Sequence, residues 1–355
     1  FVFSWAAARG PGARAESPPP PPLPPPGGGS AGSGKSTTLK TIVQHARLHF
    51  QREGLDGIAE IQLTAYTGVA AFNIGFGART ACGAFQIFPN VAWKEELEGD
   101  SFKKLEEQWG NVVLLIVDEV SFIGRAFFAR MHWRLQQAKR RFFAERALDP
   151  GKHTFGGISI ILVGDFGQLE PIDDWSMCDT ESTPRDAPKS RRRWWKHAYK
   201  GKQLLETFDE AVMLKKIHRS KDDMWWTESC LRLRDFACTK EGDYDWWREH
   251  DLDRGHFTEE QRQYFENEAV WLCARCEDVG LRNGRKLAHM AEDQKQVIHQ
   301  IHAEHSSKSK SIVKAPSSAF DGLREVINLV KGCKVMITRN VAYLYGLANG
   351  TRGRL

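Results

Sequence analysis

The sequence predicts an α/β fold built on a parallel β-sheet, and three segments carry this prediction. Residues 29–36 form a glycine-rich loop that precedes a segment with helical periodicity. Residues 112–117 are a continuous apolar run, residues 158–163 are apolar apart from Ser159, and polar residues follow each segment. Short apolar runs of this kind are typical of strands that helices cover on both faces. In such sheets ligands bind at the carboxyl ends of the strands, so the polar residues mark a candidate site.

The glycine-rich loop, Gly29 to Ser36, satisfies the pattern G-x-x-x-x-G-K-[ST]. Its glycines allow backbone N–H groups to converge on a phosphate, and the following helix directs its positive end at the same point. Lys35 adds a full charge for the β- and γ-phosphates, and the hydroxyl of Ser36 is a ligand for Mg²⁺. A Gly/Ser-rich linker that carries a lysine by chance is the alternative. The apolar residues at positions 39, 42, 43, 46 and 50 argue against it, because they share one face of a helix.

Residues 1–28 are rich in proline and glycine, a composition typical of a polyproline II or disordered spacer. The arginine-containing, acid-poor start also suits the remnant of a transit peptide. A phosphate-binding loop normally follows a buried strand, and here residues 24–26, all proline, occupy that place. Either the strand is supplied from elsewhere or the natural chain begins differently.

Two carboxylates follow the apolar run at 112–117. Asp118 is placed to hold Mg²⁺, and Glu119 to orient and deprotonate an attacking water. Gln168 follows the run at 158–163 closely enough to reach a γ-phosphate. Residues 59–66 are expected to add another strand, followed by a small-residue helix. Three strands that each end in polar residues are a more specific signal than any one of them.

Composition excludes few classes of protein. The 355 residues are 41% hydrophobic and 27% charged, an ordinary globular balance, and the net charge of +5 permits a polyanionic partner. No run of about twenty apolar residues occurs, so no membrane span is expected. The seven cysteines are odd in number and irregularly spaced, which favours reduced thiols. Only Cys273 and Cys276 form a C-x-x-C pair, and a polar helix or loop explains the nearby His299, His302 and His305 more simply than a zinc site.

Other segments have simpler interpretations. Residues 85–110 carry Lys and Glu at helical intervals and are expected to form a solvated helical connector. Residues 270–275 have the composition of a strand. Residues 190–196 combine arginines with tryptophans, and two interpretations stay open: contact with nucleic acid, or packing of a helix onto the first domain. Two further pairs are expected to pack in the core or between domains: Trp225 with Trp226, and Trp246 with Trp247.

Taken together, these motifs resemble those of the Pif family (petite integration frequency) of superfamily 1 DNA helicases. The resemblance covers residues 29–355 discontinuously, and its motifs II and III are the most specific. The similar segments are residues 31–36 (first motif), 64–71 (motif Ia), 117–121 (motif II), 164–169 (motif III), 214–219 (an arginine motif that opens the second domain) and 332–353 (a later stretch of that domain).

The resemblance implies two RecA-like domains of the P-loop NTPase class. The ATP-binding domain is expected at residues 29–205 and a partial second domain at residues 206–355, after a disordered segment at residues 1–28. The implied activity is an ATP-driven motor that moves 5′ to 3′ on single-stranded DNA and unwinds forked DNA, in DNA repair, recombination or telomere maintenance. ATP and Mg²⁺ are the implied cofactors. A monomer is expected, and the nucleus or the mitochondrion is the implied compartment.

Matched by position, the resemblance assigns Glu119 as catalytic base, Gln168 as sensor of the γ-phosphate and Arg219 as an arginine that reaches this phosphate from the second domain. Ser36 and Asp118 are the implied ligands of Mg²⁺. The nucleotide-binding residues are Gly29, Gly32, Ser33, Gly34, Lys35, Ser36 and Thr37. The DNA-binding residues are Thr67, Thr80, Asn340 and Asn349.

The chain also departs from the family pattern. Ala81 and Cys82 follow Thr80 where the family has Leu and His, and Glu170 stands where a proline is usual. Nothing before residue 29 resembles the glutamine motif that recognises adenine, and the sequence stops where the family continues to motifs V and VI. Two alternatives therefore stay open. One is a module that binds ATP and DNA without unwinding, and the other is a non-functional gene fragment, such as one from a mobile element.

Overall fold

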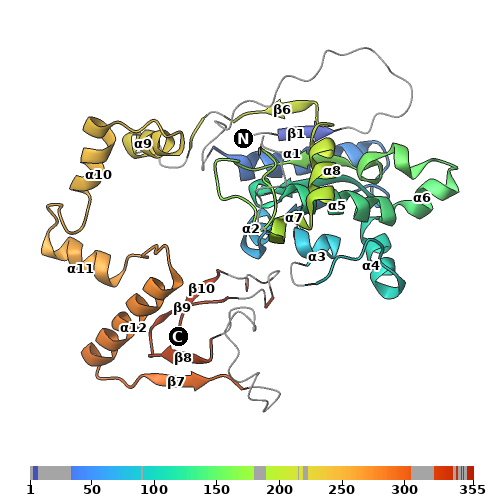
Figure 1. Cartoon of the computed structure of the whole chain (residues 1–355). Helices are drawn as coiled ribbons and strands as arrows, with labels where there is room; N and C mark the ends of the chain where they lie inside the picture. The colour runs from blue at the N-terminus through green and yellow to red at the C-terminus, as the bar shows by residue number, and fades with distance from the viewer. Residues whose placement is uncertain are drawn as a thin grey trace. The chain divides into compact units, whose positions relative to one another are not determined.

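The computed structural model describes most of the chain, with gaps. The described residues are 3–6, 33–88, 91–179, 189–214, 216–218, 223–304, 324–338, 341–342, 345, 347 and 350–355. They belong to two compact units, which are considered separately: Phe1–Asp243 with Asn340–Asn349, and Tyr244–Arg339 with Gly350–Leu355 (Figure 1). The domain boundaries expected at residues 29 and 206 stay predictions.

A six-stranded sheet organises the first unit, in the order β3-β2-β4-β5-β1-β6. The strands β3, β2, β4 and β5 run parallel, and the register places Thr64 beside Val117 and Leu115 beside Ile160. The sheet confirms the α/β fold with a parallel core. Its strands are β1 (Phe3–Ala6), β2 (Glu60–Ala65), β3 (Arg79–Thr80), β4 (Val112–Asp118), β5 (Ser159–Leu162) and β6 (Glu210–Val212).

Helices flank this sheet (Figure 1). Leu39 and Val43 are the buried residues of α1, on the face that the sequence pattern predicts. The helices α5 and α8 pack closely where Gly201 faces Arg125. A Cβ at Gly201 would clash with the backbone of Arg125, so this contact requires glycine. The helices of the first unit are α1 (Lys35–Arg52), α2 (Gly68–Ile74), α3 (Ala81–Phe85), α4 (Gly99–Trp109), α5 (Arg125–Ala138), α6 (Arg140–Glu145), α7 (Lys189–Arg192), α8 (Trp195–Leu205) and α9 (Met224–Arg234), with short 3₁₀ segments η1 (Val120–Phe122), η2 (Pro150–Lys152) and η3 (Thr154–Gly157) and a π-helical turn η4 (Lys240–Tyr244) that runs into the second unit.

The side chains of β4 show that different helices cover the two faces of the sheet. Leu115 and Val117 pack in one cluster with residues of α3, α4, α5 and α8. Ile116, between them, packs in a second cluster with residues of α1 and α2. Successive side chains of a strand point to opposite faces, so the centre of β4 is buried on both, as its apolar run predicts. By the same alternation, Asp118 belongs to the face that α1 covers.

β1 lies between β5 and β6 and runs antiparallel to both, with the backbone of residue 5 paired to Ile161 and to Glu210. Both alternatives raised by residues 24–26 stay open. Residues 7–32, with the proline tract, lie outside the described residues.

The expectation for residues 85–110 is only partly right. Residues 99–109 form the helix α4, but residues 91–98 are not helical. The segment is also more than a solvated connector, because Leu105 and Trp109 are fully buried and Trp109 stacks on Phe85. The charged pattern describes only the outer face of α4. Its apolar face packs in the core.

The packing interpretation of residues 190–196 is confirmed for the two tryptophans. Trp194 stacks with His197 at a ring distance of 5.5 Å. Trp195 meets Trp175 at 5.4 Å, and both Trp194 and Trp195 pack against a small buried cluster around Ala126. These rings therefore hold α8 and its preceding turn onto the first unit.

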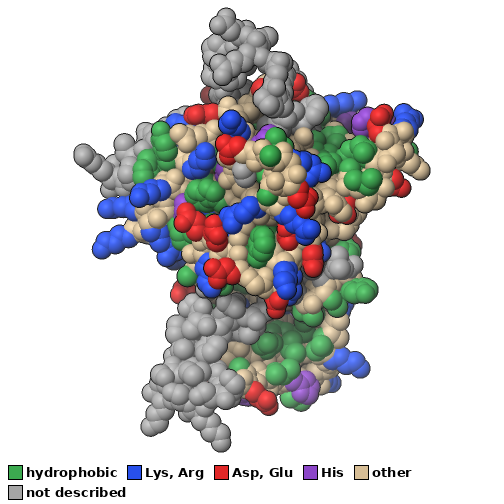
Figure 2. Space-filling view, turned by 90° about the vertical axis from the view of Figure 1, so that its right-hand side faces the viewer, with side chains coloured by type: hydrophobic (Ala, Val, Ile, Leu, Met, Phe, Trp, Pro, Cys, Tyr) green, Lys and Arg blue, Asp and Glu red, His purple; other side chains and the backbone are tan. Residues whose placement is uncertain are grey.

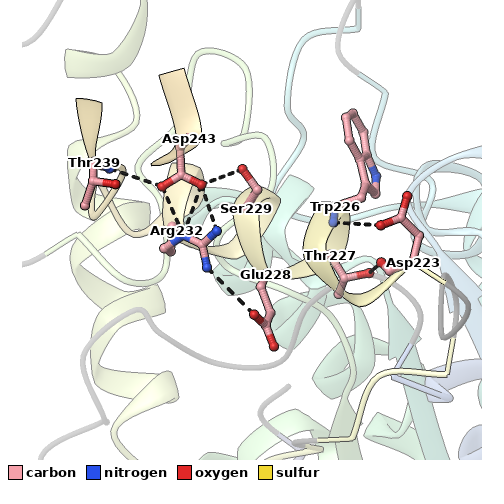
Figure 3. A network of polar contacts seen from close by, with 8 residues as sticks. All are labelled: Asp223, Trp226, Thr227, Glu228, Ser229, Arg232, Thr239 and Asp243. Atoms are coloured by element: carbon pink, nitrogen blue, oxygen red, sulfur yellow. Dashed lines mark hydrogen bonds and ion pairs between the residues drawn. The ribbon is translucent and has the colours of Figure 1, made fainter. Parts of the chain in front are cut away.

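Asp243 anchors the turn that follows α9 (Figure 3). Its buried carboxylate accepts hydrogen bonds from the Arg232 guanidinium at 2.8 Å, from Ser229 Oγ at 2.7 Å and from the Thr239 backbone N–H at 3.1 Å. The hydrogen bonds from Arg232 and Ser229 hold the pKa of Asp243 well below its usual range. The charged carboxylate thus fixes the course of the chain at the end of the first unit.

Trp225 and Trp226 of α9 are not core residues. They are 38% and 39% exposed, respectively, so the core interpretation is wrong for this pair. The buried residues of α9 are the polar Thr227 and Ser229. The hydrogen-bond network at Asp243 explains this inversion, because it occupies the inner face of the helix.

The described residues of the second unit form helices and two small antiparallel sheets. Among all described residues, no helix combines the length and the apolar character needed to cross a membrane. The elements of this unit are α10 (Asp245–Glu249), α11 (Glu259–Asn267), α12 (Cys276–Asp293), the pair β7 (His299–His302) and β8 (Val326–Leu329), and the pair β9 (Lys334–Met336) and β10 (Arg352–Arg354).

Two expectations for this unit are wrong. Residues 270–275 form no strand, and Val270 and Leu272 are 59% and 95% exposed. A strand needs a neighbour for its backbone groups, and the composition of a segment does not supply one. His299 and His302 are the first and last residues of the strand β7, so they do not lie in a helix or loop. His305 lies outside the described residues.

His132 gives the first unit an acid-sensitive stability. It is buried in α5, and its Nδ1 accepts a hydrogen bond from the Phe155 backbone N–H at 2.9 Å. Burial, with a smaller contribution from Lys200, lowers the pKa of His132 from 6.5 to about 4. Between pH 6.5 and 4 the unfolded chain therefore binds a proton at His132 that the folded chain does not bind. The contribution of neutral His132 to the free energy of unfolding is fully present above pH 6.5 and is lost as the pH falls toward 4. The loss at pH 5 is on the order of 2 kcal/mol.

The variant His132→Gln tests this effect by urea unfolding at pH 7 and pH 5. Burial also lowers the pKa of His197 to about 4, so part of the acid sensitivity remains in both proteins. We expect the stability difference between the two pH values to shrink by about 2 kcal/mol in the variant. If the stability difference between pH 7 and pH 5 were equal in the variant and the parent protein, His132 would be protonated at pH 5 in the folded chain as it is in the unfolded chain.

Candidate functional site

The N-terminus of α1 is built as an anion site. Gly34 precedes the helix with φ of 88°, a left-handed conformation that favours glycine, and Lys35 is the first helical residue. The first turn of α1 contains no acidic residue, so its positive end is not neutralised from within. Ser36 and Thr37 are exposed, and Ser33 is buried just before the helix. Backbone N–H groups in the first turn of a helix point toward its N-terminus, where they can donate to a phosphate.

Asp118 ends β4 beside this helix terminus. Its side chain is 6% exposed, and its Oδ1 accepts a hydrogen bond from the Glu119 backbone N–H at 2.9 Å. Burial raises the pKa of Asp118 to about 6, and the charge of Lys35 works in the opposite direction. This interaction of Lys35 with Asp118 brings the start of α1 and the end of β4 together.

Glu119 has an unusual backbone and an unsatisfied side chain. Its φ is 54°, a left-handed conformation that costs a non-glycine residue energy and that often marks functional positions. Its Oε2 is buried without a hydrogen-bond partner among the described residues, and so is the Oγ of Ser33. Buried polar atoms normally have hydrogen-bond partners, so Glu119 Oε2 and Ser33 Oγ are candidates for hydrogen bonds to a bound ligand. The hydroxyl of Ser36 and the carboxylate of Asp118 are oxygen donors of the kind that Mg²⁺ prefers, so the prediction that both are Mg²⁺ ligands is carried into the proposal below.

The loop after β5 completes this edge of the sheet. Asp165 folds it, because its Oδ1 accepts from the Gly167 N–H and its carbonyl accepts from the Gln168 N–H, each at 3.0 Å. Gln168 is half-buried beyond this turn. The Val163 N–H donates to the Val117 carbonyl at 2.7 Å, which holds the ends of β5 and β4 together.

Gly164 permits the close approach of this loop to η1. A Cβ at Gly164 would lie 2.7 Å from Val120 Cγ1 and 2.8 Å from the Val120 backbone nitrogen. We expect Gly164→Ala to destabilise the first unit by about 1–3 kcal/mol and to displace Gln168 from the site. Urea unfolding measures the first effect. Gly280→Ala in α12 is the matched control, because a Cβ there meets nothing within 4 Å; equal stability of Gly164→Ala and the parent protein would contradict the steric argument.

The two threonines expected to contact DNA lie at the same edge of the sheet. Thr67 follows β2 and caps α2 by accepting from the Ala70 N–H at 3.2 Å. Thr80 ends β3 and caps α3 by accepting from the Gly83 N–H at 3.3 Å. Surface charge does not mark a DNA track on the face shown in Figure 2, where positive and negative side chains are interspersed. The two caps remain candidates by position.

Several expected site residues cannot be placed. Gly29, Gly32, Arg219, Asn340 and Asn349 lie outside the described residues.

Two neighbours of the site were not expected from the sequence. The imidazole of His218 lies next to Gly34, since a Cβ on that glycine would be 3.8 Å from His218 Cδ2. Arg234 of α9 packs on Gly167, with its Cδ 2.7 Å from a Cβ built there. The sequence offered a signal only for His218, which directly precedes Arg219 of the arginine motif.

Comparison with known proteins agrees with this geometry. Residues 28–222 match the PIF1-like helicase family. Over 325 residues the chain is 27% identical to the ATP-dependent DNA helicase PIF1 of Xenopus laevis, which covers 91% of this chain and 42% of that protein. The chain spans less than half the length of the curated relatives it matches first.

Solved structures with the same fold are also found. The Pif1 helicase from Candida albicans is 25% identical with a TM-score of 0.59, over 92% of this chain and 63% of that one. The Pif1 helicase from Bacteroides in complex with ADP-AlF3 and ssDNA is 21% identical with a TM-score of 0.55, over 92% of this chain and 64% of that one. At this identity the second likeness concerns the fold alone.

Proposed function

Because the chain belongs to the PIF1-like helicase family, we propose that it hydrolyses ATP to move 5′ to 3′ along single-stranded DNA and to separate forked duplexes. The observation that carries the proposal is the electrostatic interaction between Lys35 and Asp118 at the carboxyl edge of a parallel sheet. Beside them, Glu119 keeps a buried carboxylate oxygen without a partner among the described residues. A cation, a carboxylate pair and a helix N-terminus at one point suit phosphoryl transfer to water.

The proposed nucleotide site uses the loop and the first turn of α1. Lys35 neutralises charge on the β- and γ-phosphates, and the N–H groups of Gly34, Lys35 and Ser36 donate to phosphate oxygens. Ser33 contributes its buried hydroxyl, and Gly29, Gly32 and Thr37 complete the set. Ser36 and Asp118 are the proposed ligands of Mg²⁺. When bound, this ion draws charge from the terminal phosphate.

The proposed chemistry rests on Glu119. A carboxylate oxygen with no competing hydrogen-bond partner can accept a proton from water as the water attacks the γ-phosphate. Gln168, held by the turn at Asp165, orients the water or the phosphate oxygens. Arg219 neutralises the charge that develops in the transition state, which is the role of an arginine finger.

The proposed DNA contacts are weak in sequence preference. Thr67, Thr80, Asn340 and Asn349 contact the backbone of a single strand, so affinity falls steeply with salt. The Bacteroides structure with ssDNA supports this class of ligand for a related protein. Roles in DNA repair, recombination or telomere maintenance, a nuclear or mitochondrial location and a monomeric state are part of the same proposal.

Strand separation tests the proposed function. We expect the protein to unwind a forked duplex with a 5′ single-stranded tail in the presence of ATP and Mg²⁺, and to leave a duplex with only a 3′ tail intact. Glu119→Gln is the inactive reference. Unwinding from the 3′ tail would contradict the proposed direction. ATP hydrolysis with no strand separation on either substrate would favour the alternative, a module that binds ATP and DNA without unwinding.

A further inference from the structure

A polar pocket lies in the first unit, between residues 86–88 and 91–97 on one side and helix α5 on the other. The charged residues that line it are all basic: Lys94, Arg130 and Arg134. No aspartate or glutamate is among its described lining residues, and none of its residues belongs to the proposed nucleotide site. The pocket therefore needs a separate explanation.

Three residues that line this pocket each have a buried N–H donor without an acceptor among the described residues. Arg134 is 1% exposed, and its Nη atoms donate to the backbone carbonyls of Lys94 at 2.7 Å and Glu95 at 3.0 Å. Its Nε, the Nε of Arg130 and the Nε1 of Trp93 are buried without a hydrogen-bond partner among the described residues. Buried donors without acceptors are costly, and a small local shift that exposed these three to the pocket would let a ligand with several acceptor oxygens satisfy them.

The two guanidinium groups of the pocket lie against aromatic rings. Arg130 lies 3.6 Å from the ring centre of Trp194, and Arg134 lies 4.1 Å from that of Trp93. Neither arginine forms a salt bridge among the described residues. Burial lowers the pKa of both arginines to about 10, and the charge of a neighbouring arginine lowers each pKa further, although Asp174 partly opposes the shift at Arg130.

The carboxylates around the pocket are engaged elsewhere. Asp174 is the acid that most affects Arg130, but its oxygens accept from the backbone N–H groups of Ala126, Phe127 and Trp175 at 2.7–3.0 Å. Glu96 pairs with the exposed Arg140 at 2.8 Å. The positive charge of the pocket thus stays available to a ligand.

We propose that this pocket binds a phosphoryl oxyanion. A tetrahedral phosphate offers the several acceptor oxygens that the donors lack, and arginine is suited to such groups. The expected source is a phosphodiester of a bound nucleic acid strand. Helix α3 joins Thr80 to Gln86 of the pocket, and its five residues span about 7.5 Å. The strand as source rests on the proposed function, whereas the phosphoryl pocket itself does not.

The first test uses inorganic phosphate as the probe. In NMR spectra that resolve arginine Nε–H groups, we expect the signals of Arg130 and Arg134 to shift on titration with phosphate and to saturate in the millimolar range. Sodium chloride at matched ionic strength is the control. Arg130→Gln should abolish the saturation while Arg134 keeps its hydrogen bonds to the segment at 94–95, so the fold persists.

The second test concerns the nucleic acid. Ala92 lines the pocket and is exposed, so Ala92→Glu adds a repelling carboxylate without removing a contact, and Ala92→Gln is its neutral control. With an oligothymidylate, we expect Ala92→Glu to weaken binding and to reduce the slope of log affinity against log salt by about 0.7, the value for one lost phosphate contact. Ala92→Gln should keep both values, and thermal unfolding should match for the two variants.

The outcomes separate the two sources. Saturable phosphate binding together with the changed DNA slope assigns the pocket to a strand phosphodiester. Saturable phosphate binding with equal DNA binding of both Ala92 variants supports the phosphoryl pocket and assigns it to a free phosphate or a nucleotide. No response of Arg130 or Arg134 to phosphate, with equal DNA binding of both variants, would overturn the proposal and leave the arginines as braces for the segment at 93–97. Failure of the proposed function is recognised separately, by the absence of ATP-dependent strand separation in the parent protein, and that result leaves phosphate binding at this pocket unaffected.

Discussion

Replacement of Glu119 by glutamine is expected to slow ATP hydrolysis by about 10²–10⁴-fold while ATP binding persists. The amide has nearly the shape of the carboxylate but cannot accept a proton from the attacking water. The Oε2 of Glu119 is buried and has no hydrogen-bond partner among the described residues, so no other described group competes for its lone pairs. Single-turnover hydrolysis measures the chemical step, and binding of a fluorescent ATP analogue measures affinity.

The matched control is Glu107→Gln, on the exposed face of α4. It makes the same change in charge and should leave both values unchanged. The left-handed backbone of Glu119 tolerates the substitution as well as it tolerates glutamate, so a folding defect is not expected. Hydrolysis by Glu119→Gln at the rate of the parent protein would remove Glu119 from the role of base.

Lys35→Ala is expected to weaken ATP binding by about 10²–10³-fold and to abolish measurable turnover at ordinary ATP concentrations. Loss of one partner from a buried, hydrogen-bonded charge pair costs about 2–5 kcal/mol, which corresponds to this change in affinity. Removal of Lys35 also removes the charge that opposes the raised pKa of Asp118. Equilibrium binding of ATP in the presence of Mg²⁺ measures the effect.

Lys40→Ala is the control for this variant, because Lys40 is exposed on the same helix. It changes the net charge equally and leaves the first turn of α1 intact. ATP binding by Lys35→Ala with the parent affinity would contradict the placement of the triphosphate at the helix terminus.

The parallel core and much of the candidate site were predictable from the sequence for a physical reason. The run at 112–117 carries its own information, because an apolar segment of that length has to be covered on both faces. The polar residues that follow such strands must then gather at one edge of the sheet, which places Asp118 and Glu119 near Lys35. Local patterns were sufficient because the apolar residues of each strand indicate its burial and the polar residues that follow indicate where it ends.

Contacts between distant segments could not be predicted in this way. Arg134 holds the carbonyls of Lys94 and Glu95 across about forty residues of sequence. Asp174 caps α5 across a similar distance. The prediction of a strand at residues 270–275 was wrong for the same reason. Its residue types suit a strand, but nothing in the sequence shows whether a neighbouring strand will pair with it.

ATP hydrolysis by this chain with and without single-stranded DNA tests the central claim most directly. With Glu119→Gln as the blank, we expect a Mg²⁺-dependent rate that rises when oligothymidylate is added, because the proposed motor couples the two ligands. A rate that equals the blank under both conditions, for a protein that folds cooperatively, would contradict the account.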